Sequence, residues 1–196
     1  MKPIRQHPHL QAGFSMVEVL VSLVILLIGI LGLVGMIVVS QRAEAESYQR
    51  SQALLLLQDM VGMIRANSNV AACYAISSDP ANAATPYMGV GSAITPACGY
   101  GHIQAYTRAN SDLVAWNSLL LGTSETIGTS NAGAMVGARG CVSFDSVANS
   151  YMVTVAWQGL VSTAAPAASL TCGSGLYGNE SLRRVVSIPV TIANLN

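Results

Sequence analysis

Cysteine is the residue type best suited to chemistry in this 196-residue sequence, and its spacing indicates disulfides. Zinc sites commonly pair cysteines about two to four residues apart, whereas an even number of widely spaced cysteines is typical of disulfides in an oxidising compartment. We therefore predict two disulfides and no metal site, with the sequential pairing expected among three possible connectivities. The four cysteines form no CxxC pair and all follow the longest apolar run: Cys73, Cys98, Cys141 and Cys172.

Histidine, serine and glycine form no catalytic pattern. His7 and His9 lie close to the N-terminus, and His102 stands without an acid or nucleophile motif near it in the sequence. The sequence lacks a G-x-S-x-G nucleophile motif, a phosphate-cradling glycine motif and a calcium-loop spacing of acids. We therefore predict that the protein is not an enzyme and needs no cofactor.

The charge balance argues against a nucleic-acid partner. Nine basic residues match nine acidic ones, so the formal net charge is zero. Nucleic-acid binding depends on clustered Lys and Arg that neutralise phosphates. We expect no nucleic acid among the partners.

A long uncharged segment follows a short basic one. No charge occurs from Val19 to Gln41, and about 20 apolar helical residues suffice to cross a hydrocarbon core of roughly 30 Å. Lys2 and Arg5 precede this segment without any acid, as is typical of a cytoplasmic flank. The sequence thus predicts a single membrane span with the rest of the chain on the outer side.

Glu18 directly precedes this uncharged segment, and its carboxylate helps to decide what kind of segment it is. A cleaved secretory signal ending at Ala43-Glu44-Ala45 would have too long an apolar core, and a buried soluble helix rarely stays apolar on all faces. A plain signal anchor leaves Glu18 unexplained, because a carboxylate near the bilayer costs a few kcal/mol unless it has a partner. A cut between Gly13 and Phe14 would supply an α-ammonium four residues before Glu18, on the same helical edge. The ammonium of a neighbouring subunit could also reach Glu18.

The segment from Gly13 to Leu20 (GFSMVEVL) resembles the class III signal of type IV prepilins and type II secretion pseudopilins. In that family a prepilin peptidase cuts after the glycine, methylates the new N-terminus and leaves the apolar segment in the mature protein. The resemblance implies cleavage between Gly13 and Phe14, N-methylation of Phe14 and subunit registration by Glu18. It divides this end of the chain into a leader peptide, 1–13, and a transmembrane and filament-core helix, 14–40.

Residues 41–67 read as an amphipathic continuation of the same helix. We expect the helix to end near Arg65, because Asn67-Ser68-Asn69 supplies a stop, and to lie against a sheet. Apolar residues at spacings of three and four define its buried face, which neighbouring residues widen. The face consists of Leu54, Leu57, Val61 and Ile64, with Ala53, Leu56, Met60 and Met63 beside them.

The remaining residues, 68–196, are expected to form a globular head. The segment from Ala71 to Gly101 reads as an irregular connection that a Cys73–Cys98 disulfide would close. A helix of about three turns is expected from Ser111, as its cap, to Gly122, with Leu113, Trp116 and Leu120 along one side.

Two predicted strands and a third near the C-terminus complete the head. Cys141 to Val147 and Tyr151 to Gln158 alternate β-branched and aromatic residues around the turn Ala148-Asn149-Ser150, which predicts a hairpin. Arg184 to Ala193 supplies a further strand, which Pro189 assigns to a sheet edge or a bulge. A Cys141–Cys172 disulfide would tie the intervening connection to the sheet.

Several of these segments resemble minor pilins of the PilV type. The matching sequence segments are Asp59-Met60 and Met63 to Asn67, the residues Asp112, Trp116 and Leu120, and the strand Tyr151 to Trp157. The chain departs from that family at one place, where Leu121 to Ser124 replaces the usual Leu-Pro-Gly-Gly motif. The resemblance implies an α+β type IV pilin fold, in which a long N-terminal helix packs on a small antiparallel sheet with disulfides. It also implies a minor pilin that helps initiate a type IV pilus and is incorporated into it, supporting surface adhesion and twitching motility.

The same resemblance predicts the partners and the location. The expected partners are other minor and major pilins, the prepilin peptidase, the inner-membrane assembly platform and membrane lipid. The expected location is the inner membrane, with a periplasmic head, and then the extracellular filament or its tip. A minor pseudopilin of a type II secretion system and a pilus-tip adhesin are the alternatives.

Overall fold

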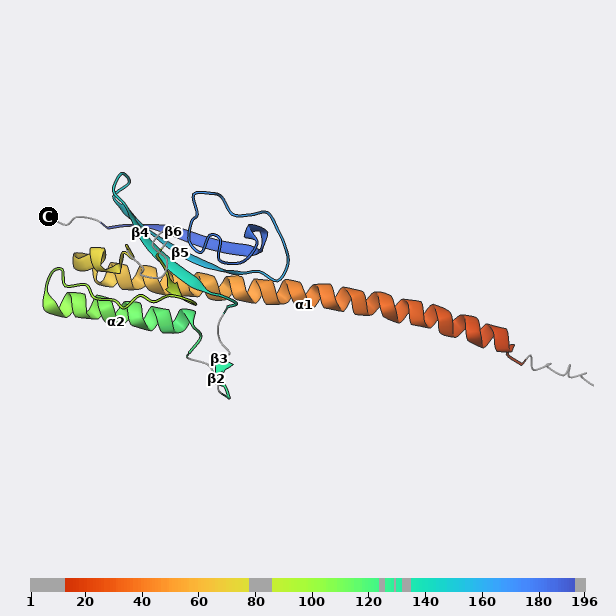
Figure 1. Ribbon diagram of the computed structural model, residues 1–196. Helices are drawn as coiled ribbons and strands as arrows, with labels where there is room; N and C mark the ends of the chain where they lie inside the picture. The colour runs from red at the N-terminus through yellow and green to blue at the C-terminus, as the bar shows by residue number, and fades with distance from the viewer. Residues whose placement is uncertain (1–12, 78–85, 124–125, 129, 132–134, 193–196) are drawn as a thin grey trace, which may run out of the picture. The chain divides into compact units, whose positions relative to one another are not determined.

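Helix α1, Met16–Ala66, dominates the N-terminal part of the computed structural model, which describes residues 13–77, 86–123, 126–128, 130–131 and 135–192 (Figure 1). The helix ends at Ala66, directly before Asn67-Ser68-Asn69, where the sequence predicted it to stop. The chain divides into two compact units, Met1–Glu44 and Ala45–Asn196, and α1 contributes to both. The second half of the helix is therefore an element of the head.

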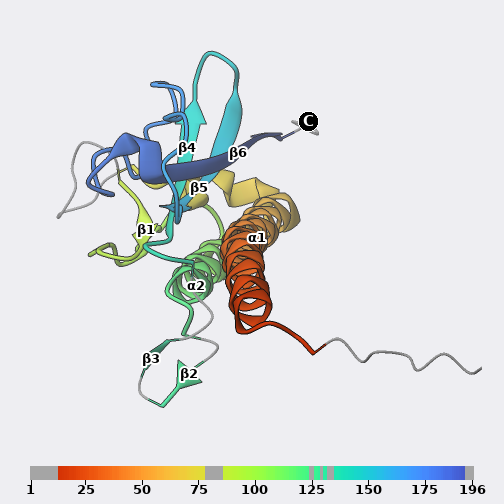
Figure 2. The ribbon, with the colours of Figure 1, turned by 90° about the vertical axis from the view of Figure 1, so that its right-hand side faces the viewer.

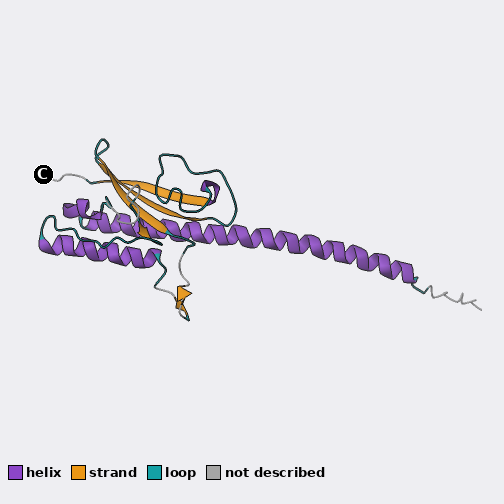
Figure 3. Ribbon diagram, in the orientation of Figure 1, coloured by secondary structure: helices purple, strands orange, loops and turns teal. Residues whose placement is uncertain are grey.

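The head contains a four-stranded antiparallel sheet in the order β1-β4-β5-β6 (Figure 3). The predicted hairpin and the predicted C-terminal strand are both present. Pro189 lies opposite Met152 on the edge strand, where its missing N–H is tolerated, as expected. Ala193, the expected last residue of that strand, lies outside the described residues. The strands are β1 (Met88–Gly89), β4 (Arg139–Asp145), β5 (Ser150–Gln158) and β6 (Arg183–Thr191).

Helix α2, Ile103–Leu120, begins eight residues before the predicted start. The prediction that Ser111 caps this helix was wrong, because Ser111 lies inside it and donates a hydrogen bond to the Thr107 carbonyl oxygen at 3.0 Å. The buried face continues backwards through Ala109, which is fully buried, to the partly buried Ala105. Alanine gives a weak periodic signal, so this first half was not recognised.

The predicted end of this helix was correct in position. The helix stops at Leu120, and Gly122 follows with a φ of +65°, a conformation that glycine adopts without a steric penalty. Leu113, Trp116 and Leu120 are all buried, as their spacing predicted.

The second half of α1 and helix α2 lie on one side of the sheet (Figure 2). Both helices share one core with the sheet residues Val142, Val153 and Val155. Leu54, assigned to the buried stripe of α1, is 40% exposed, because the buried face is centred one position away from it. The fully or nearly fully buried residues of α1 are Ala53, Leu57, Met60, Val61 and Ile64.

A smaller cluster covers the opposite face of the sheet. Its members are Tyr87, Cys141, Ala156, Cys172 and Tyr177. Successive residues of β5 point to opposite faces, so covering both faces buries every residue from Val153 to Trp157. The alternation in β5 correctly predicted a strand with one buried face. Its other face is covered by Cys172 and Tyr177, which belong to the segment between β5 and β6 that was predicted only as a connection.

The structure contains both disulfides, Cys73–Cys98 and Cys141–Cys172, in the sequential pairing expected above. They span sequence separations of 25 and 31 residues. Closing loops of such lengths contributes about 3 to 4 kcal/mol each in the chain-entropy model. The first holds a 3-10 helix, η1 (Ser68–Tyr74), against the segment before α2, where the sequence analysis expected only irregular chain.

Besides η1 and β1, three short elements were not predicted. A two-stranded ribbon, β2 (Thr126–Ile127) with β3 (Ser130–Asn131), follows α2. A 3-10 helix, η2 (Glu180–Leu182), precedes β6. All three are two or three residues long, which is too short for a periodic pattern to indicate.

Candidate functional site

The start of helix α1 is the first candidate site, and its cap is formed by Ser15. The Ser15 hydroxyl accepts a hydrogen bond from the backbone N–H of Val17 at 3.3 Å, and the Ser15 carbonyl accepts from the backbone N–H of Glu18 at 3.0 Å. Such a cap fixes the point at which the helix begins. Gly13 and Phe14 therefore lie outside the helix, in a segment whose peptide bonds form no part of a helical hydrogen-bond ladder.

Glu18 lies in the first turn of α1 with an exposed side chain. No ion pair involves Glu18 within the described part of the chain. A carboxylate in this turn is also stabilised by the helix dipole. Ser15 and Glu18 together match the S-x-x-E capping-box pattern, which the sequence analysis did not recognise although it was visible.

The capping box gives Glu18 a second possible role that needs no partner subunit. In that motif the acidic or amide side chain accepts from the backbone N–H of the cap residue. In the structure the Ser15 hydroxyl accepts from the backbone N–H of Val17, the second helical residue, and not from that of Glu18, and the Glu18 side chain is exposed, so neither bond of the motif is formed. Any experiment on Glu18 therefore has to separate its charge from its capping capacity.

The apolar part of α1 has no cover within its own unit. Every residue from Gly13 to Glu44 is exposed, including Leu31 at 71% and Val39 at 68%. By length and composition α1 can cross a membrane. A continuous apolar surface of this length requires lipid or packed apolar neighbours, because water solvates it unfavourably.

Within the head, polar contacts made by Trp116 and by Glu46 attach α1 to the other elements, in addition to the shared core. The indole N–H of Trp116 donates to the Leu56 carbonyl oxygen at 2.9 Å, and Trp116 is fully buried. Glu46 accepts from the backbone N–H of Leu160 at 2.9 Å and pairs with Arg184 at 3.2 Å. These bonds hold α2, the 159–163 loop and the edge strand to the same helix.

Two family models match consecutive parts of the chain. Residues 8–34 match the prokaryotic N-terminal methylation motif, and residues 35–102 match the type IV pilin Tt1218. The chain carries a type IV pilin methylation motif and has the type IV pilin fold. No curated protein and no solved structure matches the chain significantly.

The pilin motif and fold imply prepilin processing and assembly with other pilins. With the apolar helix, they indicate membrane anchoring and incorporation into a pilus. Type IV pilins are a structural family and not an enzyme family. The predicted type IV pilin motif and fold are thus confirmed, and the assignment to minor pilins of the PilV type stays a prediction.

The pilin motif brings Gly13, Phe14 and Glu18 together at one helix end. The cysteines lie elsewhere, as links within the head, and His102 precedes the first turn of α2 without making a side-chain cap. In the described residues no group of three or more His, Cys, Asp or Glu side chains could hold a metal ion. The predicted site residues other than the cysteines are therefore Gly13, Phe14 and Glu18, all at the start of α1.

Polar side chains that the sequence analysis missed hold the pilin head together. The Tyr74 hydroxyl donates to Asp112 at 2.6 Å, and burial together with that bond raises the pKa of Tyr74 to about 12. Arg183, only 3% exposed, pairs with Glu180 at 2.6 Å and donates to the Leu170 carbonyl oxygen at 2.6 Å. A hydrogen bond from the backbone N–H of Gly175 is the main cause that lowers the pKa of Glu180. Tyr74 and Asp112 come from different segments, so no local sequence pattern predicts that pair, whereas Glu180 and Arg183 are only three residues apart in the sequence.

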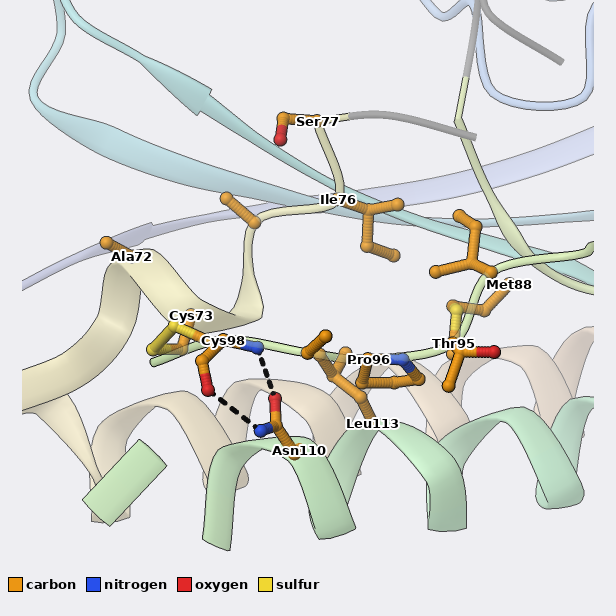
Figure 4. A pocket seen from close by; sticks show the side chains of 13 residues that line it. Ala72, Cys73, Ile76, Ser77, Met88, Thr95, Pro96, Cys98, Asn110 and Leu113 are labelled. Atoms are coloured by element: carbon orange, nitrogen blue, oxygen red, sulfur yellow. Dashed lines mark hydrogen bonds between the residues drawn. A yellow bond between two sulfur atoms is a disulfide. The ribbon is translucent and has the colours of Figure 1, made fainter. Parts of the chain in front are cut away.

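A hollow of about 320 Å³ lies between η1, the Cys73–Cys98 disulfide and α2 (Figure 4). Its most conspicuous polar side chain is Asn110, whose amide accepts from the backbone N–H of Cys98 at 2.9 Å and donates to the Cys98 carbonyl oxygen at 3.0 Å. Both the oxygen and the nitrogen of that amide therefore hold the chain beside the disulfide. Apolar side chains such as Ile76, Met88 and Pro96 form much of the remaining wall, which offers no reactive group.

Proposed function

We propose that this chain is a minor pilin of the PilV type that helps initiate assembly of a type IV pilus and is incorporated into it. The observation that carries the proposal is the exposed apolar helix unit, 13–44, which begins with a methylation motif and continues into a disulfide-linked head. Lipid covers such a helix before assembly, and neighbouring helices cover it afterwards. One segment thereby serves as membrane anchor and filament core in turn.

Processing at Gly13-Phe14 gives the helix its charge partner. Prepilin peptidase removes residues 1–13 and methylates Phe14, and the new α-ammonium lies four residues before Glu18. In the filament the ammonium of one subunit faces Glu18 of a neighbour, so that an axial shift between subunits leaves a buried charge unpaired. The value of such a pair lies mainly in fixing register.

The chain then has three functional parts after the leader. Residues 14–40 span the inner membrane or the filament core, residues 41–67 join this helix to the head, and residues 68–196 form the periplasmic and later extracellular head. Lys2 and Arg5 on the leader favour this orientation, because positive flanks remain cytoplasmic. Two disulfides suit the oxidising periplasm.

Contacts with other minor and major pilins and with the inner-membrane assembly platform follow from this role. The type IV pilin match over residues 35–102 supports a pilus and not a secretion system, because this region includes the second half of α1 and the Cys73–Cys98 loop. Surface adhesion and twitching motility are the expected cellular outputs of the pilus.

Deleting the gene tests the proposal against the secretion alternative. We expect surface filaments and twitching to fall by at least about tenfold, and secretion of exoproteins to remain normal. The measurement combines filament recovery after shearing, colony spreading and exoprotein activity in the medium. Normal filaments with lost secretion would contradict the pilus assignment and favour a pseudopilin.

A further inference from the structure

A second hollow, at the end of the head formed by η1 and the β4–β5 hairpin, differs in character from the one beside the Cys73–Cys98 disulfide. Its volume is about 210 Å³. This is below the roughly 300–1,000 Å³ typical of pockets that enclose a drug-sized ligand, so the hollow suits one ring. It is lined by Ser68, Asn69, Ala71, Ala72, Tyr100, Phe144, Asn149, Tyr151 and Ile192.

Three aromatic side chains line this hollow: Tyr151, which packs partly against the core, and Tyr100 and Phe144, which are more exposed. Tyr100 is 66% exposed and Phe144 is 47% exposed. Phe144 and Tyr151 are cross-strand partners whose ring centroids lie 4.9 Å apart with a tilt of 45°. Aromatic rings kept partly exposed at one place provide flat apolar surfaces for a ligand.

The backbone holds Tyr100 in place from both sides. Cys98, two residues earlier, is linked to Cys73 in η1. Gly101, directly after Tyr100, has a φ of +84°, and a Cβ there would lie 2.5 Å from the Val70 side chain of η1. The backbone at Tyr100 is thus held beside η1 by a covalent link and a close approach, which reduces the backbone entropy lost on binding.

The hollow also carries polar groups that the fold leaves unused. The Asn69 and Asn149 amides and the Tyr100 hydroxyl make no hydrogen bond to any side chain or backbone group in the described residues. Asn149 has a φ of +46°, set by a turn in which Asp145 accepts from the backbone N–H groups of Val147 and Ala148. No charged side chain lines the hollow.

We propose that this hollow binds one ring of a neutral saccharide. A pyranose presents C–H groups on its face, which suit the negative faces of Tyr100, Phe144 and Tyr151. Its hydroxyl groups both donate and accept, as do the two asparagine amides. The absence of charged lining residues matches a neutral ligand, since an anionic one would lack a counter-charge.

A nucleic-acid base is the main competing ligand, because bases also stack on aromatic side chains. Single-stranded nucleic acid, however, is bound with a positively charged groove along its backbone. The hollow has no Lys or Arg in its wall, and the chain carries only nine basic residues against nine acidic ones. The saccharide is therefore the better match.

Saturation-transfer NMR on the full-length protein tests this proposal. The protein is kept in a detergent without a sugar headgroup, and the probes are the methyl pyranosides of glucose, galactose, N-acetylglucosamine and N-acetylgalactosamine. We expect saturable transfer, strongest to ring C–H protons, for at least one probe. Failure of all four to bind saturably would overturn the proposal.

Two variants and a matched control locate the binding. Tyr100→Ala should weaken binding at least about tenfold, because it removes the most exposed ring. Asn149→Gly should weaken it several-fold while preserving the turn, since glycine accepts a positive φ. Tyr48→Ala, which removes a tyrosine of similar exposure (62%) from α1, should leave binding unchanged.

The remaining outcomes are equally decisive. An equal loss of binding in Tyr48→Ala would indicate nonspecific association and overturn the proposal. Tighter binding of a short oligothymidylate that Tyr100→Ala abolishes would assign the hollow to nucleic acid and overturn it as well. The test does not depend on whether the protein acts in pilus assembly, because it measures binding to the isolated protein.

Discussion

Glu18→Gln should reduce the amount of this protein in sheared surface filaments by at least about tenfold, although glutamine and glutamate have nearly the same size. The proposed partner of Glu18 is an α-ammonium on a helix packed in an apolar filament core. Removing one member of a buried ion pair typically costs about 3 to 5 kcal/mol, and about 1.4 kcal/mol already corresponds to tenfold. The filament-incorporated fraction, measured by immunoblot relative to the membrane fraction, gives the result.

The glutamine variant is informative because a capping box accepts either Glu or Gln. It therefore keeps the possible cap with Ser15 and removes only the charge, whereas Glu18→Ala removes both. Glu44→Gln, which neutralises an exposed acid farther along the same helix, is the matched control and should assemble normally. Normal assembly of Glu18→Gln with failure of Glu18→Ala would assign Glu18 to capping and disprove the charge pair.

Gly140→Ala should destabilise the head by about 3 kcal/mol, a large effect for adding a single methyl group. A Cβ at Gly140 would lie 2.2 Å and 2.6 Å from ring atoms of Trp116 and 2.8 Å from Leu120. Trp116 is fully buried and tied to the Leu56 carbonyl oxygen, so its ring cannot move aside without losing that bond. Overpacking in a closed core typically costs about 1 to 3 kcal/mol, sometimes more.

Denaturant unfolding followed by tryptophan fluorescence measures this effect, because Trp116 and Trp157 are both buried. Gly62→Ala is the control, since a Cβ there has nothing within 4 Å and alanine favours a helix. The control should be neutral or up to about 1 kcal/mol more stable. Equal stability of Gly140→Ala and the unmodified protein would show that Trp116 does not pack against β4 as described.

The architecture was largely predictable because its signals are local. The uncharged segment after Glu18 and the alternation in Tyr151 to Gln158 each depend on a few consecutive residues. The long helix, the hairpin and the edge strand with Pro189 were therefore predicted correctly. The start of α2 was not, because alanine at positions 105 and 109 produces little periodic contrast, and Ser111 imitated a cap.

The long-range polar contacts of the head could not be predicted, because their partners are distant in the sequence. Glu46 and Arg184 are separated by 138 positions, and Tyr74 and Asp112 by 38. The aromatic hollow is of the same kind, since Tyr100 and Phe144 meet only after the Cys73–Cys98 link and the hairpin have formed. At the N-terminus the reverse holds: Gly13, Phe14, Ser15 and Glu18 are consecutive or nearly so, and the motif was readable from the sequence.

Mass spectrometry of the protein recovered from sheared surface filaments tests the central claim most directly. A filament subunit processed at its methylation motif should begin at N-methylated Phe14 and contain two intact disulfides. A protein that begins at Met1 has no α-ammonium four residues before Glu18. A protein that begins after Ala45, as a cleaved secretory product would, has lost the apolar helix. Either N-terminus would contradict the account.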